Sequence, residues 1–160
     1  MSMLPKVEIF AGLSEEEQAA LENSCVTRNY PRNTVVINEN DFADSLYVVE
    51  SGRVKVYCSD KNGKEYIMNT LGPGDYFGEL ALLDDDRRSA SVRTLEKSTF
   101  TIMFKDEFHA IMERHPKIAQ TLIRNLTRRV RKLTENVKSL ALQDVYGRVT
   151  TVLMTLAEPR

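Results

Sequence analysis

Between residues 34 and 104 the sequence alternates short apolar runs with turn-forming residues. The runs are Leu46–Val49, Val54–Cys58, Tyr66–Leu71, Ser91–Thr94 and Thr99–Phe104. Asn62-Gly63 lies between the second and third runs and is the dipeptide most typical of a tight β-hairpin. Ser51-Gly52 and Gly72–Asp75 are further turn signals. Short strands at this spacing predict an antiparallel sandwich or barrel rather than a series of strand–helix–strand units.

Helical patterns lie on both sides of this strand region. Ser14 followed by Glu17 forms a capping box, which predicts a helix within residues 1–25. After the strands the period becomes helical, and a helix is predicted over Glu107–Arg114 that stops near Pro116. The pattern therefore indicates a mainly β fold with flanking helices.

A long helix is predicted from Pro116 to about Gln143, because this stretch contains neither glycine nor another proline. At 1.5 Å per residue its length is on the order of 40 Å. Asp144 is the expected N-cap of a last amphipathic helix over Val145–Ala157. We therefore divide the chain into residues 1–115, 116–143 and 144–160.

The apolar residues of the long helix follow a coiled-coil pattern. They are Leu122, Leu126, Val130, Leu133, Val137 and Leu140, at steps of 4, 4, 3, 4 and 3. The alternative is a helix that packs on its own domain, but such a helix usually has a wider apolar stripe. Basic residues such as Arg128 and Lys132 occupy the other faces, where a solvated surface is expected. The pattern predicts a homodimer through this helix.

Composition narrows the class of protein. The 160 residues carry a formal net charge of −1, which argues against a general nucleic-acid-coating protein. Neither a signal peptide nor an apolar run of membrane-spanning length is recognisable, so we expect a cytoplasmic protein without a membrane partner. Cys25 and Cys58 are isolated, which disfavours a disulfide scaffold or a zinc site. His109 and His115 lack the spacing of a helical metal pair, and we expect no metal.

The stretch Phe77–Val92 contains groups suited to an anion and a hydroxyl. Gly78 allows close backbone approach, and Glu79–Leu83 can form a short helix whose free N–H groups attract an anion. Arg88 supplies a permanent charge that fits a phosphate, and Ser89 adds a hydroxyl donor. Glu79 fits such a site if it accepts a hydrogen bond from a sugar hydroxyl and is partly neutralised by Arg88. These groups predict a ligand with one phosphate and one free hydroxyl on a compact ring.

Simpler explanations of the same stretch exist. Asp84–Asp86 is expected to be a solvated loop tip. Glu79 and Arg88 could form a purely structural ion pair. The chain offers neither a Ser/His/Asp set nor an activated cysteine, so we expect a binding protein and not an enzyme.

The sequence resembles a known family at these residues. Gly78–Leu82 followed by Arg88-Ser89-Ala90 is similar to the phosphate-binding cassette of cyclic-nucleotide-binding domains. Together with Leu46–Tyr57, Gly72–Asp75 and Asp144–Val149, it makes residues 10–157 resemble the sensor half of a bacterial CRP/FNR-type transcription regulator.

The resemblance implies an antiparallel, jelly-roll-like β-roll that binds a cyclic nucleotide, with cyclic AMP as the first candidate, and a dimerisation helix. The implied phosphate and sugar contacts are Gly78 and Leu80 through their backbone, Glu79 on the ribose 2′-hydroxyl, and Arg88, Ser89 and the Ala90 N–H on the phosphate. The implied lining residues on the ribose and base side are Val56, Met68 and Leu71.

The long helix departs from the cyclic AMP receptors of the family at the base contact. Those receptors place two successive hydroxyl residues over the base, and the matching pair here is Leu133-Thr134. Phosphate binding is therefore expected, whereas selectivity for cyclic AMP stays open. An iron–sulfur or haem sensor would need ligands that Cys25, Cys58 and His109 do not supply in the family's pattern.

The family also implies partners outside this chain. Nucleotide binding would re-aim a helix-turn-helix domain through a hinge at Asp144–Arg148, and that domain is expected to be missing from these 160 residues. DNA and RNA polymerase are therefore expected as partners of the full-length protein only. Two alternatives remain: a cyclic-nucleotide regulatory module of an enzyme or channel, and a degenerate sensor for another effector such as cyclic di-GMP.

Overall fold

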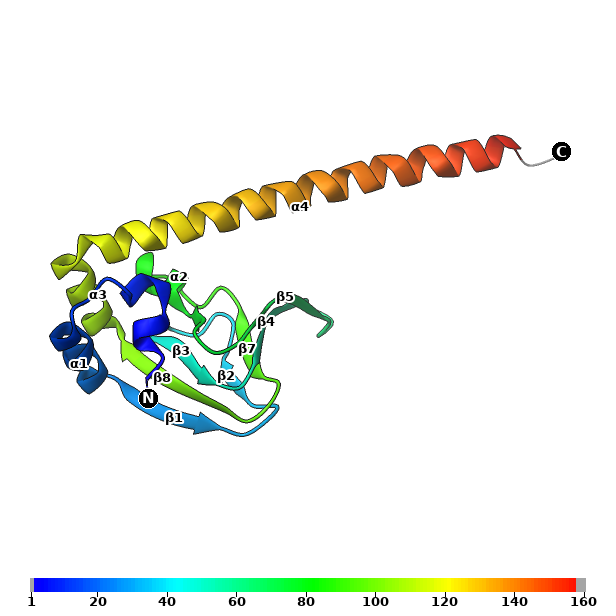
Figure 1. Cartoon of the computed structure of the whole chain (residues 1–160). Coiled ribbons are helices and arrows are strands. Elements are labelled where there is room, and N and C mark those ends of the chain that lie inside the picture. The colour runs from blue at the N-terminus through cyan, green and yellow to red at the C-terminus, as the bar shows by residue number, and fades with distance from the viewer. Residues whose placement is uncertain (1, 158–160) are drawn as a thin grey trace. The chain divides into compact units, whose positions relative to one another are not determined.

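The computed structural model describes residues 2–157 and consists of two compact units. The first unit ends at Ala119 and the second begins at Gln120. The first unit contains all the strands and the short helices, and the second contains most of the long C-terminal helix (Figure 1).

Eight strands form two antiparallel sheets in the first unit. They are β1 (Val26–Tyr30), β2 (Val35–Ile37), β3 (Ser45–Ser51), β4 (Val54–Ser59), β5 (Glu65–Leu71), β6 (Tyr76–Phe77), β7 (Ser91–Thr94) and β8 (Ser98–Phe104). The strand orders are β1-β8-β3-β6 and β2-β7-β4-β5. The β-roll expected from the sequence is confirmed, and the predicted hairpin is the β4–β5 pair.

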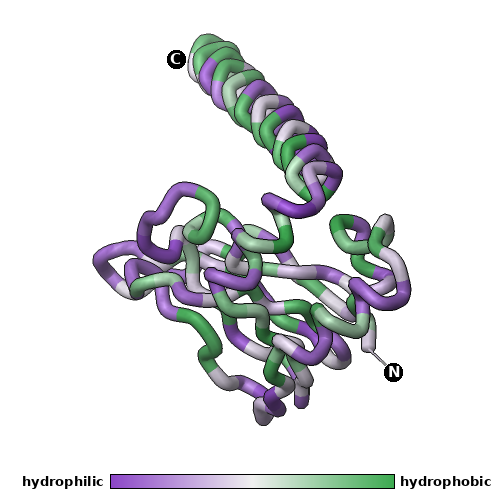
Figure 2. Tube along the Cα trace, turned by 90° about the vertical axis from the view of Figure 1, so that its left-hand side faces the viewer, coloured by the Kyte–Doolittle hydropathy of each residue, from purple (hydrophilic) through white to green (hydrophobic). Residues whose placement is uncertain are grey.

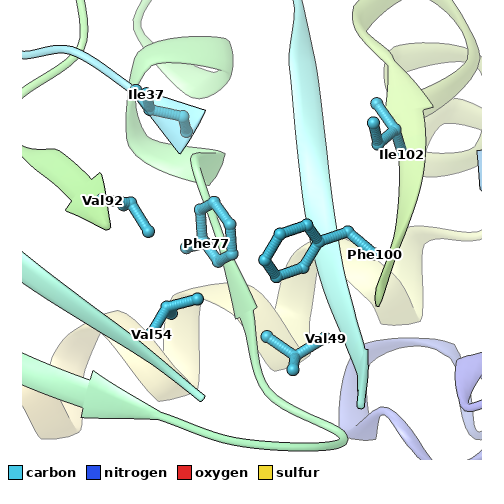
Figure 3. Packing of buried hydrophobic residues seen from close by; sticks show 7 residues of the cluster. All are labelled: Ile37, Val49, Val54, Phe77, Val92, Phe100 and Ile102. Atoms are coloured by element: carbon cyan, nitrogen blue, oxygen red, sulfur yellow. The ribbon is translucent and has the colours of Figure 1, made fainter. Parts of the chain in front are cut away.

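The core of the first unit lies between the two sheets. Seven buried side chains form its central cluster: Ile37, Val49, Val54, Phe77, Val92, Phe100 and Ile102 (Figure 3). Ile37, Val54 and Val92 come from one sheet and the other four from the second. The rings of Phe77 and Phe100 meet edge to face with centroids 5.5 Å apart. Each such side chain contributes about 1.5–3 kcal/mol through burial, so this cluster fixes how the sheets face each other.

The connection from β3 to β4 shows why a glycine is needed where the chain changes sheets. Gly52 has φ +95°, and a Cβ there would lie 2.2 Å from Ser98 Oγ and 2.7 Å from the Lys97 carbonyl oxygen. A larger residue would meet both a backbone strain and a steric overlap. The turn signal at Ser51-Gly52 therefore reflects close packing against the start of β8.

The helices begin and end largely where the sequence predicts. Two 3-10 turns, η1 (Leu4–Lys6) and η2 (Glu8–Phe10), precede α1 (Glu15–Ser24). Both hydrogen bonds of the Ser14/Glu17 capping box are present at 3.2 Å. α2 covers Glu79–Leu83 and α3 covers Lys105–Arg114. Strand β1 was not predicted, because its residues are mostly exposed and show no alternation of buried and exposed positions.

The long helix α4 runs without interruption over Pro116–Ala157. The predicted helix start at Asp144 is therefore wrong. Asp144 instead forms an i,i+4 ion pair with Arg148 at 3.1 Å within the continuous helix. Gly147 costs about 1 kcal/mol relative to alanine, which is too little to end a helix of this length.

Hydrophobic and hydrophilic residues alternate along the tube of α4 (Figure 2). None of the helices described is apolar enough over a sufficient length to span a membrane.

Candidate functional site

The site is built around the turn between β6 and α2. Gly78 is the N-cap of α2 and has φ +92°, in the left-handed region that favours glycine. A Cβ on Gly78 would lie 2.6 Å from Arg88 Nη1 and 3.2 Å from the Ser45 carbonyl oxygen. The glycine of the predicted cassette is therefore required by backbone geometry and by the close approach of Arg88.

Arg88 is held inside the first unit, with 5% of its surface exposed. Its Nη1 donates a hydrogen bond to the Gly78 carbonyl oxygen at 2.9 Å, and its Nη2 donates to the Ser45 carbonyl oxygen at 2.7 Å. Burial lowers the pKa of Arg88, and the nearby Tyr47 and Asp44 act in the opposite direction. An arginine stays protonated under these conditions, so the interior holds a fixed positive charge.

Asp44, Ser45 and Tyr47 are contacts of Arg88 that the sequence analysis missed. Asp44 Oδ1 lies 4.0 Å from Arg88 Nη2, and the guanidinium lies 6.0 Å from the centroid of the Tyr47 ring. Ser45 is separated from Arg88 by 43 positions in the sequence. Because β3 binds the arginine mainly through a backbone carbonyl, the identity of its side chains carried no signal for this contact.

Glu79 is the buried acid of the site. It is the first residue of α2 and is 4% exposed. Its negative charge is one of those that raise the pKa of Arg88. The carboxylate of Glu79 and the guanidinium of Arg88 are thus both removed from bulk water.

The loop that follows α2 has a solvated tip and a partly covered end. Asp84–Asp86 are exposed, and Lys105 pairs with Asp85 and holds the pKa of that carboxyl below its usual value. Ser89 is exposed and Ala90 is half-buried.

The Cys58 thiol donates to the Ser89 carbonyl oxygen at 3.6 Å, and burial raises the pKa of that thiol. Cys58 therefore adjoins the site, although its sequence context gave no indication of this.

The three predicted lining residues and Leu80, which was predicted as a backbone contact, occupy different surroundings. Val56 and Leu71 pack against the core cluster between the sheets. Met68 is the extra residue of a β-bulge, since Val56 pairs with Asn69 and Tyr57 pairs with Ile67, and it is 60% exposed. Leu80 lies on α2 and is exposed. Val56 and Leu71 are thus half-buried against the core, whereas Met68 and Leu80 are exposed.

Leu133 and Thr134 lie on α4 in the second unit. Leu133 is 49% exposed. The Thr134 hydroxyl donates to the Val130 carbonyl oxygen at 2.9 Å and keeps lone pairs that can accept a hydrogen bond.

Among the residues that the structure describes, no group of three or more acidic, histidine or cysteine side chains could hold a metal ion.

Comparison with protein families places this site in a known context. The family model for the cyclic nucleotide-binding domain matches residues 27–115, more than half of the chain and the whole cassette. A CRP-like cAMP-activated global transcriptional regulator from Mycobacterium tuberculosis is 33% identical over 156 residues, which cover 98% of this chain and 70% of the relative.

The chain belongs to the cyclic nucleotide-binding domain family, among the CRP-like regulators. The cyclic AMP receptor protein of Thermus thermophilus is 32% identical over 92% of this chain and 68% of its own length. The crystal structure of the Thermus thermophilus catabolite activator protein matches with a TM-score of 0.80 at 32% identity, over 92% of this chain and 70% of that one. The regulatory domain of Toxoplasma gondii PKA with cAMP gives a TM-score of 0.64 at 30% identity, over 68% and 41%. The CRP-like β-roll followed by a long helix is therefore the fold of this chain.

Proposed function

We propose that this chain is the cyclic-nucleotide-sensing, homodimeric part of a CRP-like transcription regulator in the cytoplasm. Binding of the nucleotide would be coupled to DNA binding by a helix-turn-helix domain outside this sequence. The buried Arg88 next to the start of α2 is the observation that carries the proposal, because a fixed interior cation favours a fixed anion.

The proposed phosphate contacts come from one short segment. Arg88 Nη1 and Nη2 each carry a second N–H beyond the one that binds a backbone carbonyl, and these can donate to phosphate oxygens. The Ser89 hydroxyl and the Ala90 N–H would complete the donor set. Gly78 and Leu80 would contribute backbone groups at the start of α2, where the free N–H groups already favour an anion.

The sugar and base contacts follow from the same arrangement. Glu79 would accept a hydrogen bond from the ribose 2′-hydroxyl, because its charge is compensated by Arg88. Val56, Met68 and Leu71 would supply apolar contacts to the ribose and the base. Leu133 and Thr134 of the dimerisation helix would cover the base, with only Thr134 able to accept a hydrogen bond from an exocyclic amine.

Calorimetric titration with cyclic AMP, cyclic GMP and cyclic di-GMP tests the ligand class. We expect cyclic AMP to bind with modest affinity, because residue 133 is a leucine where the family's cyclic AMP receptors have a hydroxyl residue. The base therefore loses one hydrogen bond, worth about 0.5–1.5 kcal/mol. Leu133→Thr should tighten cyclic AMP binding several-fold and leave cyclic GMP nearly unchanged. Binding of cyclic di-GMP alone would replace the proposal by a sensor for another effector.

A regulatory module of an enzyme is the second candidate, and it fits less well. The PKA regulatory domain matches 68% of this chain, whereas the Mycobacterium tuberculosis regulator matches 98% and the Thermus thermophilus activator 92%, so that these matches extend into the long helix. The relatives compared are regulators, and we propose that the chain itself catalyses no reaction.

A further inference from the structure

Asn69 lies on the face of the β4–β5 hairpin that is turned toward the interior of the roll. Side chains that pair directly across an antiparallel ladder lie on the same face of the sheet. Val54 pairs with Leu71, and Val56 pairs with Asn69. Val54 belongs to the core cluster, and Val56 and Leu71 pack against that cluster. Asn69 therefore shares its face with two of the residues proposed to line the ribose and base side.

The same face of the hairpin continues from Asn69 to the phosphate-binding segment. Cys58 follows Val56 by two positions along β4, so their side chains lie on one face. The Cys58 thiol donates a hydrogen bond to the Ser89 carbonyl oxygen at 3.6 Å. Successive residues on one face of a strand are about 7 Å apart. A nucleotide whose phosphate is bound at Arg88 and Ser89 would therefore have its base within reach of Asn69.

The Asn69 side chain is accessible and keeps hydrogen-bonding capacity for a ligand. It is exposed, and its Oδ1 accepts a hydrogen bond from the Thr70 backbone N–H at 2.9 Å. The oxygen has a second lone pair, and the amide nitrogen has two N–H groups. An amide can therefore offer a donor and an acceptor side by side to the same ligand.

This pair of groups distinguishes the two purine bases. Adenine presents the N7 acceptor next to the donor of its exocyclic amine, and an asparagine amide pairs with both at once. Guanine presents two acceptors on the same edge, N7 and O6. The Asn69 amide nitrogen could still donate to guanine N7, but Asn69 Oδ1 would then face another oxygen.

We propose that Asn69 makes the nucleotide site select adenine over guanine. Its Nδ2 would donate to N7 and its Oδ1 would accept from the exocyclic amine, while Val56 and Leu71 contact the apolar face of the ligand. The assignment rests on the proposed cyclic-nucleotide function, to which it adds the base preference. It also supplies a polar base contact from the first unit in a chain that has Leu133 in place of a hydroxyl residue.

Calorimetric titration with cyclic AMP, 7-deaza cyclic AMP and cyclic GMP tests the assignment. The 7-deaza analogue has a C–H group in place of N7 and keeps the same phosphate and ribose. The wild type should bind cyclic AMP about threefold to tenfold more tightly than the analogue and about tenfold more tightly than cyclic GMP. Asn69→Leu, checked for folding by its thermal melt, should weaken cyclic AMP binding about tenfold and bind cyclic AMP and the analogue equally. A purely structural effect would weaken both nucleotides alike and leave their ratio unchanged.

Thr70→Ala is the matched control for Asn69→Leu. Thr70 is exposed on the same strand and pairs with Lys55, which places its side chain on the opposite face of the hairpin. The substitution keeps the backbone N–H that binds Asn69 Oδ1, so this variant should retain the preferences of the wild type. An unchanged ratio of cyclic AMP to 7-deaza cyclic AMP affinity in Asn69→Leu would overturn the assignment and leave the proposed function standing. A wild type that binds none of the three nucleotides would overturn both.

Discussion

At the scale of single residues, Gly78 and Arg88 depend on each other. The turn at Gly78 brings its carbonyl oxygen to Arg88 Nη1, and the missing Cβ leaves room for the guanidinium. The same arginine also binds the Ser45 carbonyl oxygen, so it links the cassette to β3. A substitution at Gly78 therefore acts on the backbone, the arginine and β3 together.

Gly78→Ala should lower the free energy of unfolding by about 1–3 kcal/mol, because the left-handed backbone is strained for alanine and the new Cβ overlaps Arg88. Urea unfolding measures this change. Gly12→Ala is the matched control, since nothing lies within 4 Å of a Cβ at that position, and it should stay within about 0.5 kcal/mol of the wild type. Equal effects of the two substitutions would mean that Gly78 is not constrained as described.

At the scale of elements, local signals predicted most of the fold. The Asn62-Gly63 turn gave the β4–β5 hairpin, and the Ser14/Glu17 pair gave the start of α1. The partners of Arg88 could not be predicted, because contacts with backbone carbonyls across 43 positions leave no pattern in the side chains. The continuous α4 was missed because Asp144 is favourable both as an N-cap and in an ion pair inside a helix.

The start of α1 should give a pH-dependent contribution to stability. The pKa of Glu17 lies below 4.5. The largest cause is a hydrogen bond from the Ser14 backbone N–H. A hydrogen bond with the Ser14 side chain and the charges of His115 and Arg114 act in the same direction. A lowered folded-state pKa means that the charged form stabilises the fold above 4.5 and that this contribution is lost as the pH falls through the folded-state pKa.

Urea unfolding of Glu17→Gln between pH 7 and 3 measures the effect. The variant should be less stable than the wild type at pH 7, and the difference should narrow as the pH falls. Glu16→Gln serves as control on the same exposed turn. A difference that is constant with pH would show that the Glu17 charge does not contribute.

At the scale of the whole molecule, the long helix carries exposed apolar residues. Val130, Leu133, Val137 and Leu140 are each at least 49% exposed and repeat with a coiled-coil period. We expect them to be covered in a parallel two-fold dimer, because a row of apolar side chains is unfavourable in water.

Val130→Glu combined with Val137→Glu should give a monomer in analytical ultracentrifugation, because like charges would meet across the two-fold axis. Lys132→Glu combined with Ser139→Glu has the same spacing away from the apolar row and should leave the dimer intact. A wild-type chain that is monomeric at micromolar concentration would contradict the predicted dimer.

Calorimetric titration of Arg88→Ala tests whether the Arg88 cassette binds cyclic AMP, as we propose. The adjacent Arg87 is exposed and lies 4.3 Å from the centroid of the Phe42 ring, so Arg87→Ala is the matched control. We predict that Arg88→Ala, while still folded, weakens cyclic AMP binding by about 2–4 kcal/mol, roughly 30- to 700-fold, and that Arg87→Ala binds like the wild type. An unchanged dissociation constant for a folded Arg88→Ala would show that the phosphate binds elsewhere.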